Sequence, residues 1–246
     1  MMKRLSAVRC GSAIAIILLA GAVTAQAQVR RVDDGRQSIG FNLGYFSVRA
    51  EDGRADGDVL VADLSSSEAL AFDVKDFNGA TFGGEWLFAV SDYLEAGVGA
   101  GFYQRTVPSV YADFTNEDGS EIEQDLKLRV IPISATVRFL PIGRGGVEPY
   151  VGAGVGLFNW RYSEVGEFVD NVDFSIFRES YVADGTTAGP VVLGGIRFPV
   201  ADVWTIGGEL RYQKAEGEID QAETQLLGDK IDLGGWTTSF TFHLRF

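Results

Sequence analysis

The sequence predicts an all-β fold, an eight-stranded antiparallel up-and-down transmembrane β-barrel with four long extracellular loops. Three observations predict it. Glycine is abundant and proline rare, 31 against 6 in 246 residues, and glycine destabilises a helix interior by about 1 kcal/mol relative to alanine. Apolar and polar residues alternate with a period of two in several segments, as on the two faces of a strand. The connections between these segments alternate between short and long, which is typical of outer-membrane barrels.

The first 27 residues have the features of a cleaved secretory signal peptide. Basic residues precede an apolar run over residues 13–23, and Ala25 and Ala27 are small residues at the expected cleavage site. A membrane-anchor helix is the competing interpretation, but the run is shorter than the roughly 20 residues that a span requires. Cys10 is the only cysteine, so the mature chain is expected to lack thiols and disulfides. The predicted organisation is a signal peptide (1–27), a short periplasmic segment (28–36) and a barrel domain (37–246).

Eight segments have strand character, and their even number is expected to leave both chain ends on the periplasmic side. A closed barrel is the arrangement in which such strands satisfy every backbone group within lipid. The predicted strands are residues 37–49, 75–90, 93–105, 126–140, 148–160, 187–199, 204–215 and 232–246. The short connections are residues 91–92, 141–147 and 200–203, and the long ones are residues 50–74, 106–125, 161–186 and 216–231.

The last predicted strand shows the alternation most clearly. Its polar face carries Thr237, Ser239, Thr241, His243 and Arg245, which suits a polar lumen. A soluble sandwich would instead bury the aromatic face, so this strand alone leaves both folds open. The recurring strands and alternating connections favour the membrane barrel. The large apolar face consists mainly of Trp236, Phe240, Phe242, Leu244 and Phe246.

Glycines occupy one face of the third and fifth predicted strands. In residues 94–102 and 151–157, aliphatic residues alternate with glycines, and we assign the aliphatic faces to lipid and the glycine faces to the lumen. The interior of an eight-stranded barrel is only wide enough for side chains, so glycines leave room for long polar ones. The run Gly152 to Gly156 could instead cradle a phosphate, but that motif requires a following helix, and the sequence continues as a strand.

Three motifs resemble the small outer-membrane β-barrel family, which includes the OmpA transmembrane domain, OmpX and OmpW. They are Glu-Pro-Tyr-Val-Gly-Ala-Gly-Val-Gly (148–156), Val-Ile-Pro-Ile-Ser-Ala-Thr-Val-Arg-Phe-Leu-Pro (130–141) and the terminal Phe-Thr-Phe-His-Leu-Arg-Phe (240–246). The resemblance covers the predicted mature chain and implies insertion by the outer-membrane assembly machinery, which in such proteins recognises the final strand and its last residue, Phe246. The peptidoglycan-binding domain of full-length OmpA is missing, so anchoring to the cell wall is not expected.

Charge is concentrated in the long connections. The chain has a formal net charge of −13, and a field of this sign disfavours a nucleic-acid partner. Divalent cations could bridge the acidic loops to each other or to lipopolysaccharide, although solvated acidic loops that oppose aggregation are the simpler interpretation. Residues 58–64 and 174–177 are apolar enough to extend strands above the membrane or to fold over the mouth.

Charged residues within the predicted strands should point inward, because Lys or Arg at the lipid midplane costs about 2 to 4 kcal/mol. Once inside they need partners. A crosslinked ladder would plug the lumen, whereas exchanging pairs would gate a narrow pore; we favour the plug. The expected lumen network is Glu85, Glu95, Arg105, Arg138, Glu148, Arg197, Glu209 and Arg211, with Arg129 and Arg245 as further inward-facing charges.

A lipid A-modifying enzyme is the catalytic alternative. His243 is the only histidine, and Ser38 and Ser47 lie on the first strand, which should pair with the last; a triad requires a serine within reach of the imidazole. We expect His243 to belong to the polar network instead. The sequence therefore predicts a monomeric, non-enzymatic barrel without cofactor or metal site, with a structural or surface-interaction role. A narrow channel or OmpW-like conduit, with an apolar pocket among Phe82, Trp86 and Trp160, is the alternative.

Overall fold

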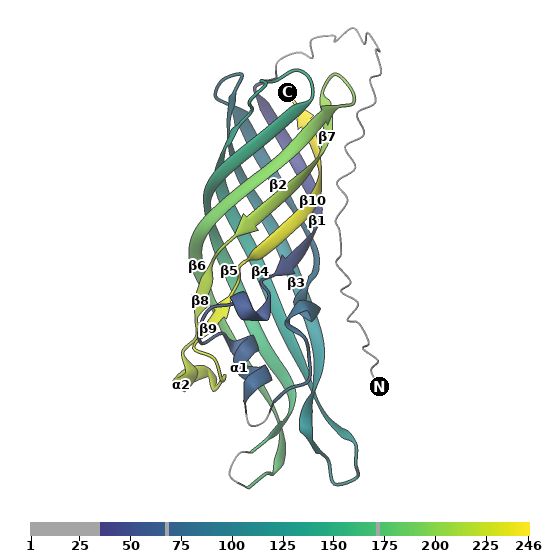
Figure 1. Ribbon diagram of the computed structural model, residues 1–246, viewed down its shortest axis with the longest axis vertical. Helices are drawn as coiled ribbons and strands as arrows, with labels where there is room; N and C mark the ends of the chain where they lie inside the picture. Colours follow the sequence, from purple (N-terminus) through teal and green to yellow (C-terminus); the bar gives the residue numbers. More distant parts are fainter. Residues whose placement is uncertain (1–34, 67–68, 171–172) are drawn as a thin grey trace, which may run out of the picture. The chain divides into compact units, whose positions relative to one another are not determined.

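The computed structural model describes residues 35–246 except 67–68 and 171–172, so the predicted signal peptide lies outside the described residues. Eight antiparallel strands close into a barrel (Figure 1). Strands adjacent in sequence pair with each other, and the last pairs with the first, in the order β1-β10-β7-β6-β5-β4-β3-β2. The predicted eight-stranded up-and-down barrel is confirmed. The strands are β1 (Gln37–Val48), β2 (Gly79–Ala89), β3 (Leu94–Thr115), β4 (Glu121–Phe139), β5 (Glu148–Val169), β6 (Ile176–Pro199), β7 (Trp204–Gln213) and β10 (Gly235–Arg245).

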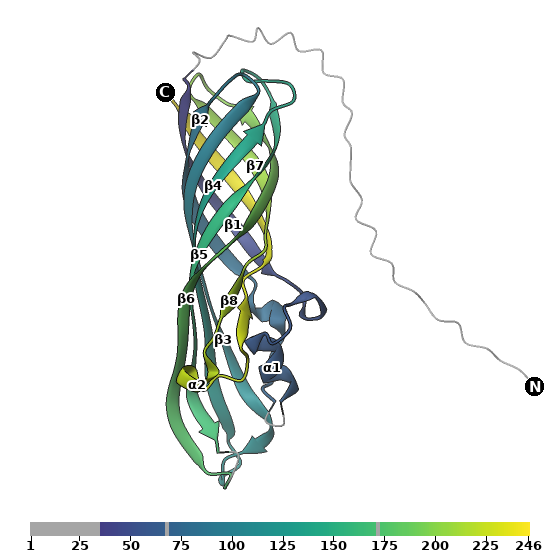
Figure 2. The same cartoon turned by 90° about the vertical axis from the view of Figure 1, so that its left-hand side faces the viewer.

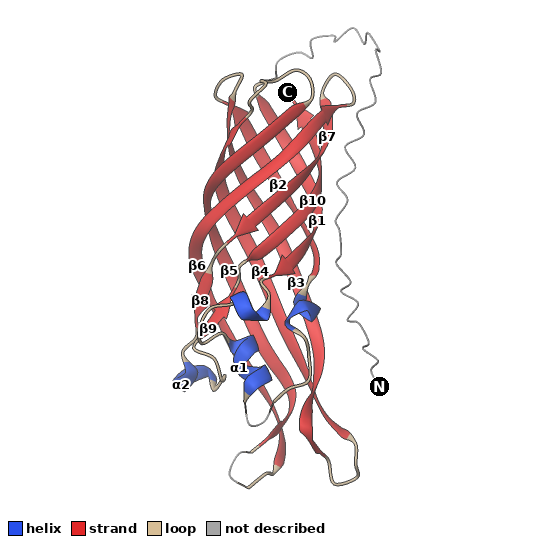
Figure 3. Ribbon diagram, viewed as in Figure 1, coloured by secondary structure: helices blue, strands red, loops and turns tan. Residues whose placement is uncertain are grey.

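Short elements occupy the connections β1–β2 and β7–β10, at the end of the barrel away from the C-terminus (Figure 3). None of the described helices is long and apolar enough to cross a membrane. The first connection contains η1 (Glu51–Gly53), α1 (Val59–Ser65) and η2 (Val74–Phe77), and the second contains β8 (Glu216–Glu218), α2 (Gln221–Thr224) and β9 (Lys230–Asp232).

Four neighbouring strands, β3 to β6, extend well beyond the other four (Figures 1 and 2). Much of the predicted loops 106–125 and 161–186 is strand, and only residues 116–120 and 170–175 connect the pairs β3–β4 and β5–β6. The register of β5 against β6 is continuous from Glu148–Arg197 to Val169–Ile176. The barrel therefore continues outward as a curved four-stranded sheet, which is open on the side where β7, β10, β1 and β2 end.

The chemistry of the two strand faces inverts along β4. Near the periplasmic end, Ile133 and Val137 are 54% and 56% exposed on the outside while Arg138 is buried inside. Farther out, Leu126 and Leu128 are buried inside, and the outward positions carry charged residues such as Lys127. A strand in lipid is apolar outside, and a strand in water is apolar inside. The inversion near Ile131 therefore marks the outer edge of the hydrocarbon layer.

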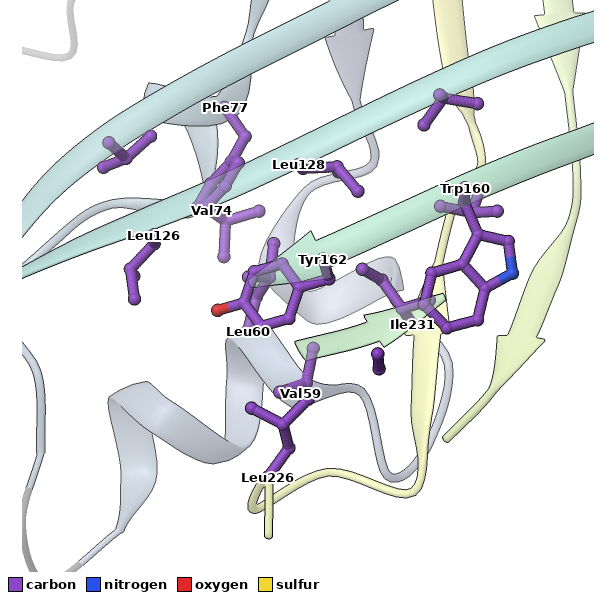
Figure 4. Packing of buried hydrophobic residues seen from close by; sticks show 14 of the residues in the cluster. Val59, Leu60, Val74, Phe77, Leu126, Leu128, Trp160, Tyr162, Leu226 and Ile231 are labelled. Atoms are coloured by element: carbon purple, nitrogen blue, oxygen red, sulfur yellow. The ribbon is translucent and has the colours of Figure 1, made fainter. Parts of the chain in front are cut away.

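The extension holds an apolar core of its own (Figure 4). α1 places Val59 and Leu60, both without exposed surface, against the inner face of the four long strands. Trp160 and Tyr162 of β5 belong to the same cluster. The predicted apolar segment 58–64 thus folds over the mouth as a helix, because its burial completes a core that the four long strands leave open.

Charged groups tie the two capping connections together. Arg54 donates from Nε to Asp58 Oδ1 at 2.6 Å and from Nη2 to the Asp232 carbonyl at 2.9 Å. The Asp232 amide donates to Asp58 Oδ2 at 2.6 Å, and Arg49 pairs with the Asp232 carboxylate at 2.8 Å. Asp58 and Asp232 are fully buried at their side chains, so these bonds hold the residues 50–78 and 214–234 as one cap.

Candidate functional site

The inside of the barrel carries two tiers of ion pairs. In the tier nearer the periplasm, Arg197 pairs with Glu95 at 2.6 Å and with Glu148 at 3.4 Å. Arg245 also pairs with Glu148, and Arg144 lies 3.5 Å from Glu95. Four strands and the β4–β5 turn contribute to this tier. It links opposite walls of the barrel through buried, charge-assisted bonds.

The second tier is centred on Arg138, which has no exposed surface. Its Nη1 donates to Glu85 Oε1 at 2.9 Å, and its Nη2 donates to Glu209 Oε2 at 3.0 Å. Arg211 donates to Glu209 Oε1 at 2.9 Å, and His243 Nε2 lies 2.8 Å from Glu85 Oε1. Every carboxylate of this tier therefore has more than one partner, which offsets the penalty of burying charge.

Tyr150 joins the two tiers. The guanidinium carbons of Arg138 and Arg197 each lie 5.0 Å from its ring centroid, and its hydroxyl donates to Glu209 Oε2 at 3.0 Å. Cation–π contacts of this geometry are favourable when desolvated. The stacked arginines and ring occupy the centre of the barrel rather than lining a pore.

Glycines make room for this network, as the sequence predicts. A Cβ added at Gly40 would lie 2.4 Å from the His243 ring, and one at Gly152 would lie 3.0 Å from the Arg138 side chain. A Cβ at Gly99 would lie 3.2 Å from Glu85. The inward glycines therefore face the bulky charged residues across the sheet. A cavity of about 50 Å³ lies beside the second tier, and its lining includes Glu209, Arg211, Ser134 and Gln213 together with apolar residues such as Pro132.

The structure brings seven of the eight predicted network residues together and places one elsewhere. Arg105 is exposed at the outer rim, where its Nε donates to the Asp76 carbonyl at 2.8 Å. It lies outside the lumen because it is level with Gly79, the first residue of β2, at the outer end of the barrel. The prediction for Arg129 is also wrong: Arg129 faces outward beside Lys127 and Arg161. It lies on the extracellular side of the inversion, where the outward face of β4 is polar. The seven residues brought together are Glu85, Glu95, Arg138, Glu148, Arg197, Glu209 and Arg211.

Two members of the network are absent from the sequence prediction. Tyr150 shares its strand face with Glu148 and Gly152, so the alternation could have placed it inside. Arg144 lies in a turn, where no periodicity predicts a direction. Its Nη2 also donates to the Gly35 carbonyl at 3.0 Å, a contact between segments far apart in the sequence.

The residues of the catalytic alternative are not assembled as a triad. His243 pairs across the sheet with Gly40, whereas Ser38 pairs with Arg245 and Ser47 with Trp236. Within the described part of the chain, the hydrogen bond of His243 goes to Glu85, and its Nδ1 is buried without a partner. The nucleophile–base contact that such chemistry requires is thus missing from this arrangement.

The apolar pocket expected for a conduit does not form as predicted. Phe82 and Trp86 are 58% and 43% exposed on the outer face of the barrel, whereas Trp160 is 1% exposed inside the extracellular core. Phe82 and Trp86 therefore lie on the outer surface of the barrel, whereas Trp160 lies inside the extracellular core. The three side chains do not line a common pocket.

The outer face of the barrel is a continuous apolar surface. Phe41, Leu43 and Val155 are each at least 60% exposed. In β10, Trp236, Phe240 and Phe242 are exposed, Leu244 is half-buried, and His243 and Arg245 are buried; Phe246, directly after the strand, is exposed. The predicted faces of the last strand are therefore confirmed. Such a belt in contact with water would be strongly unfavourable. Among the described residues, no three acidic or histidine side chains converge as a metal site.

A closed barrel with an apolar outer belt and a charged interior defines a transmembrane β-barrel of the outer-membrane type. Residues 15–244 match the family described as "Outer membrane protein beta-barrel domain", and the chain belongs to this family. Its place is therefore the outer membrane of a Gram-negative cell.

Several solved outer-membrane proteins are similar to this chain. OprG from Pseudomonas aeruginosa is 12% identical with a TM-score of 0.48, over 86% of this chain and 96% of OprG. Neisserial surface protein A is 13% identical with a TM-score of 0.45, over 85% and 96%. The outer membrane protease OmpT from Escherichia coli is 10% identical with a TM-score of 0.42, over 85% and 96%. No curated protein sequence matches the chain. At these identities the similarity concerns the fold and assigns no activity.

Proposed function

We propose that the protein is a non-enzymatic barrel whose lumen is closed and whose role is structural or surface-interacting. The two tiers of ion pairs carry this proposal. Arg138 and Arg197 stack on Tyr150 and pair with carboxylates from several other strands. Because each charge is buried and paired, opening the centre would require several favourable contacts to break together. An interior filled in this way therefore argues against a role in solute transport.

The extracellular half supports a role at the cell surface. Its four long strands, α1 and the β8–β9 ribbon share a core with Leu60, Trp160 and Ile231 at 1% exposure or less. A packed core of this kind is typical of a rigid domain, whereas unstructured loops would leave these side chains exposed. A rigid surface above the membrane is suited to holding a partner.

The outward basic residues favour lipopolysaccharide as a neighbour. Arg129 and Arg161 are directly opposite each other on β4 and β5, with Lys127 beside them. Like charges in this position repel, and the phosphate groups of outer-leaflet lipid would relieve that repulsion. The cluster lies just above the inversion on β4, at the depth of the lipid headgroups.

The remaining parts of the proposal concern biogenesis and assembly. We include cleavage of the predicted signal peptide after Ala27, insertion by the outer-membrane assembly machinery through the β10 face ending in Phe246, and a monomeric state. We also propose that divalent cations bridge the carboxylates of the acidic loops to lipopolysaccharide.

Planar-bilayer recording of the purified full-length protein tests the closed lumen. We expect no steady single-channel steps, because the paired interior leaves no aqueous path. Steady steps in the natural protein that disappear in Arg138→Ala or Glu209→Ala, but persist in Arg105→Ala, would instead support a narrow channel. Incubation with lipid A tests the non-enzymatic role: acyl transfer or release that is lost in His243→Ala would contradict it.

A further inference from the structure

A cavity in the extracellular half has acidic and aromatic walls. Its volume is about 240 Å³. Asp63 of α1, Glu164 of β5 and Gln124 of β4 line its inner part, and all three are at most 6% exposed. Leu227 and Phe177, 54% and 38% exposed, line its outer part. The cavity therefore runs from the surface to a buried pair of carboxyl groups, within the cap above the membrane.

Two buried acceptors in this cavity lack a donor. Glu164 Oε1 and Gln124 Oε1 have no hydrogen-bond partner among the described residues. The orientation of the Gln124 amide is fixed, because its Nε2 donates to the Glu167 carbonyl at 3.0 Å and to the Tyr111 hydroxyl at 2.9 Å. Rotating the amide would place its oxygen against a carbonyl oxygen. A buried acceptor without a partner is unfavourable, so the missing group is a donor.

The lining also lacks positive charge. None of the described residues around the cavity is lysine, arginine or histidine. The Tyr162 hydroxyl donates to Asp63 Oδ2 at 3.2 Å and also hydrogen-bonds Glu164, so one neutral donor serves two carboxyl groups while Glu164 Oε1 has none. Burial raises the pKa of Glu164 to about 7, and burial together with Glu164 raises the pKa of Asp63. A bound cation would stabilise the charged form of both groups.

Aromatic side chains form the wall next to the carboxyl groups. The ring of Phe168 packs against Tyr181 with centroids 4.7 Å apart and against Phe177 at 6.0 Å. Aromatic faces attract organic cations and pack against apolar bodies, whereas a bare metal ion requires several converging oxygen ligands. No such group of three acidic or histidine side chains is found among the described residues.

We propose that this cavity binds a small primary ammonium compound, with its ammonium group between Glu164, Asp63 and Gln124 and its apolar body against Phe168. An ammonium group offers three donors, which matches the two unpartnered oxygens, Glu164 Oε1 and Gln124 Oε1, and the Asp63 carboxyl group. The inference adds a ligand to the surface role, and it does not depend on whether the lumen is closed.

Calorimetry on the full-length protein in detergent tests the proposal with benzylamine and its neutral analogue benzyl alcohol. At about pH 8 we expect saturable binding of benzylamine and none of benzyl alcohol. Glu164→Gln should weaken benzylamine binding roughly tenfold or more, as expected for loss of a charge-assisted hydrogen bond. The matched control, Glu179→Gln, changes an exposed carboxylate on β6 and should bind as the natural protein does.

The pH dependence supplies a second readout. At about pH 5.5 the amine stays protonated but Glu164 does not stay charged, so binding should weaken, and Glu164→Gln should remove most of this dependence. The other titratable or charged groups nearby are Asp58 and Arg54 before α1, Tyr111 on β3, Tyr162 on β5, Tyr181 on β6 and Asp170 after β5.

A folding control accompanies each variant, because Glu164→Gln alters a buried group. If circular dichroism shows that Glu164→Gln is misfolded, Asp63→Asn replaces it with the same expected loss. The proposal is overturned if the natural protein fails to bind benzylamine at about pH 8, if benzyl alcohol binds equally well, or if folded variants of Asp63 and Glu164 both bind unchanged. Binding of Ca²⁺ without benzylamine would overturn it in favour of a metal site.

Discussion

Replacing Arg138 by leucine removes the centre of the lumen network. Arg138 donates to both Glu85 and Glu209, at 2.9 and 3.0 Å. After the change, Glu209 keeps Arg211 at 2.9 Å, but Glu85 keeps only His243 and an Arg211 guanidinium 3.9 Å away. Removing one partner of a buried ion pair typically costs about 3 to 5 kcal/mol. We therefore expect the free energy of unfolding to fall by about that amount.

Urea unfolding in phospholipid vesicles measures this loss, with the fluorescence of the four tryptophans as the signal. Arg105→Leu is the control, because Arg105 is exposed and should change stability by less than about 1 kcal/mol. Adding Glu85→Gln to Arg138→Leu should restore part of the stability, since it removes the carboxylate left without a partner. A loss for Arg138→Leu no larger than that for Arg105→Leu would refute the network.

Three further predictions concern the extracellular half. Trp160→Ala should destabilise the extension by about 3 to 5 kcal/mol, seen as faster proteolysis of the cap with the barrel still heat-modifiable on gels; unchanged proteolysis would contradict the core. Asp58→Ala should release the first connection, because Arg54 and the Asp232 amide lose their acceptor; mass spectrometry should find new cleavage within residues 50–78, and none would contradict the cap. The folded-state pKa of Glu164 is raised to about 7, so the free energy of unfolding should fall by up to about 3 kcal/mol as the pH rises from about 4.5 to 7. Urea unfolding of Glu164→Gln at a series of pH values should show a smaller change of this free energy with pH.

The sequence predicts the membrane part of the fold well because one physical rule acts there. Lipid outside and charge inside impose a period of two, so the faces of β3, β5 and β10 follow from alternation. The seven lumen residues follow from the cost of placing charge in lipid. Glycine positions such as Gly152 follow from the same rule, since the inside of the barrel is narrow.

The extracellular part is harder to predict because the rule inverts there. Beyond Ile131 the charged residues lie outside and Leu126 and Leu128 lie inside, so a search for outward apolar residues ends the strand too early. This inversion also explains the misplacement of Arg129. The burial of residues 58–64 depends on strands far away in the sequence, and the carboxyl pair of Asp63 and Glu164 brings together α1 and β5, which no local pattern connects.

Cysteine labelling of the folded protein in intact cells tests the central arrangement most directly. Single cysteines would replace three residues in turn. Thr136 is 6% exposed in the lumen, Phe41 is 63% exposed on the lipid face, and Ser180 is exposed to solvent on the outer part of β6. With a membrane-impermeant maleimide, we expect the cysteine at 180 to react, while those at 136 and 41 react only after unfolding in urea. Reaction of the cysteine at 136 as fast as that at 180 would contradict a filled, charged interior.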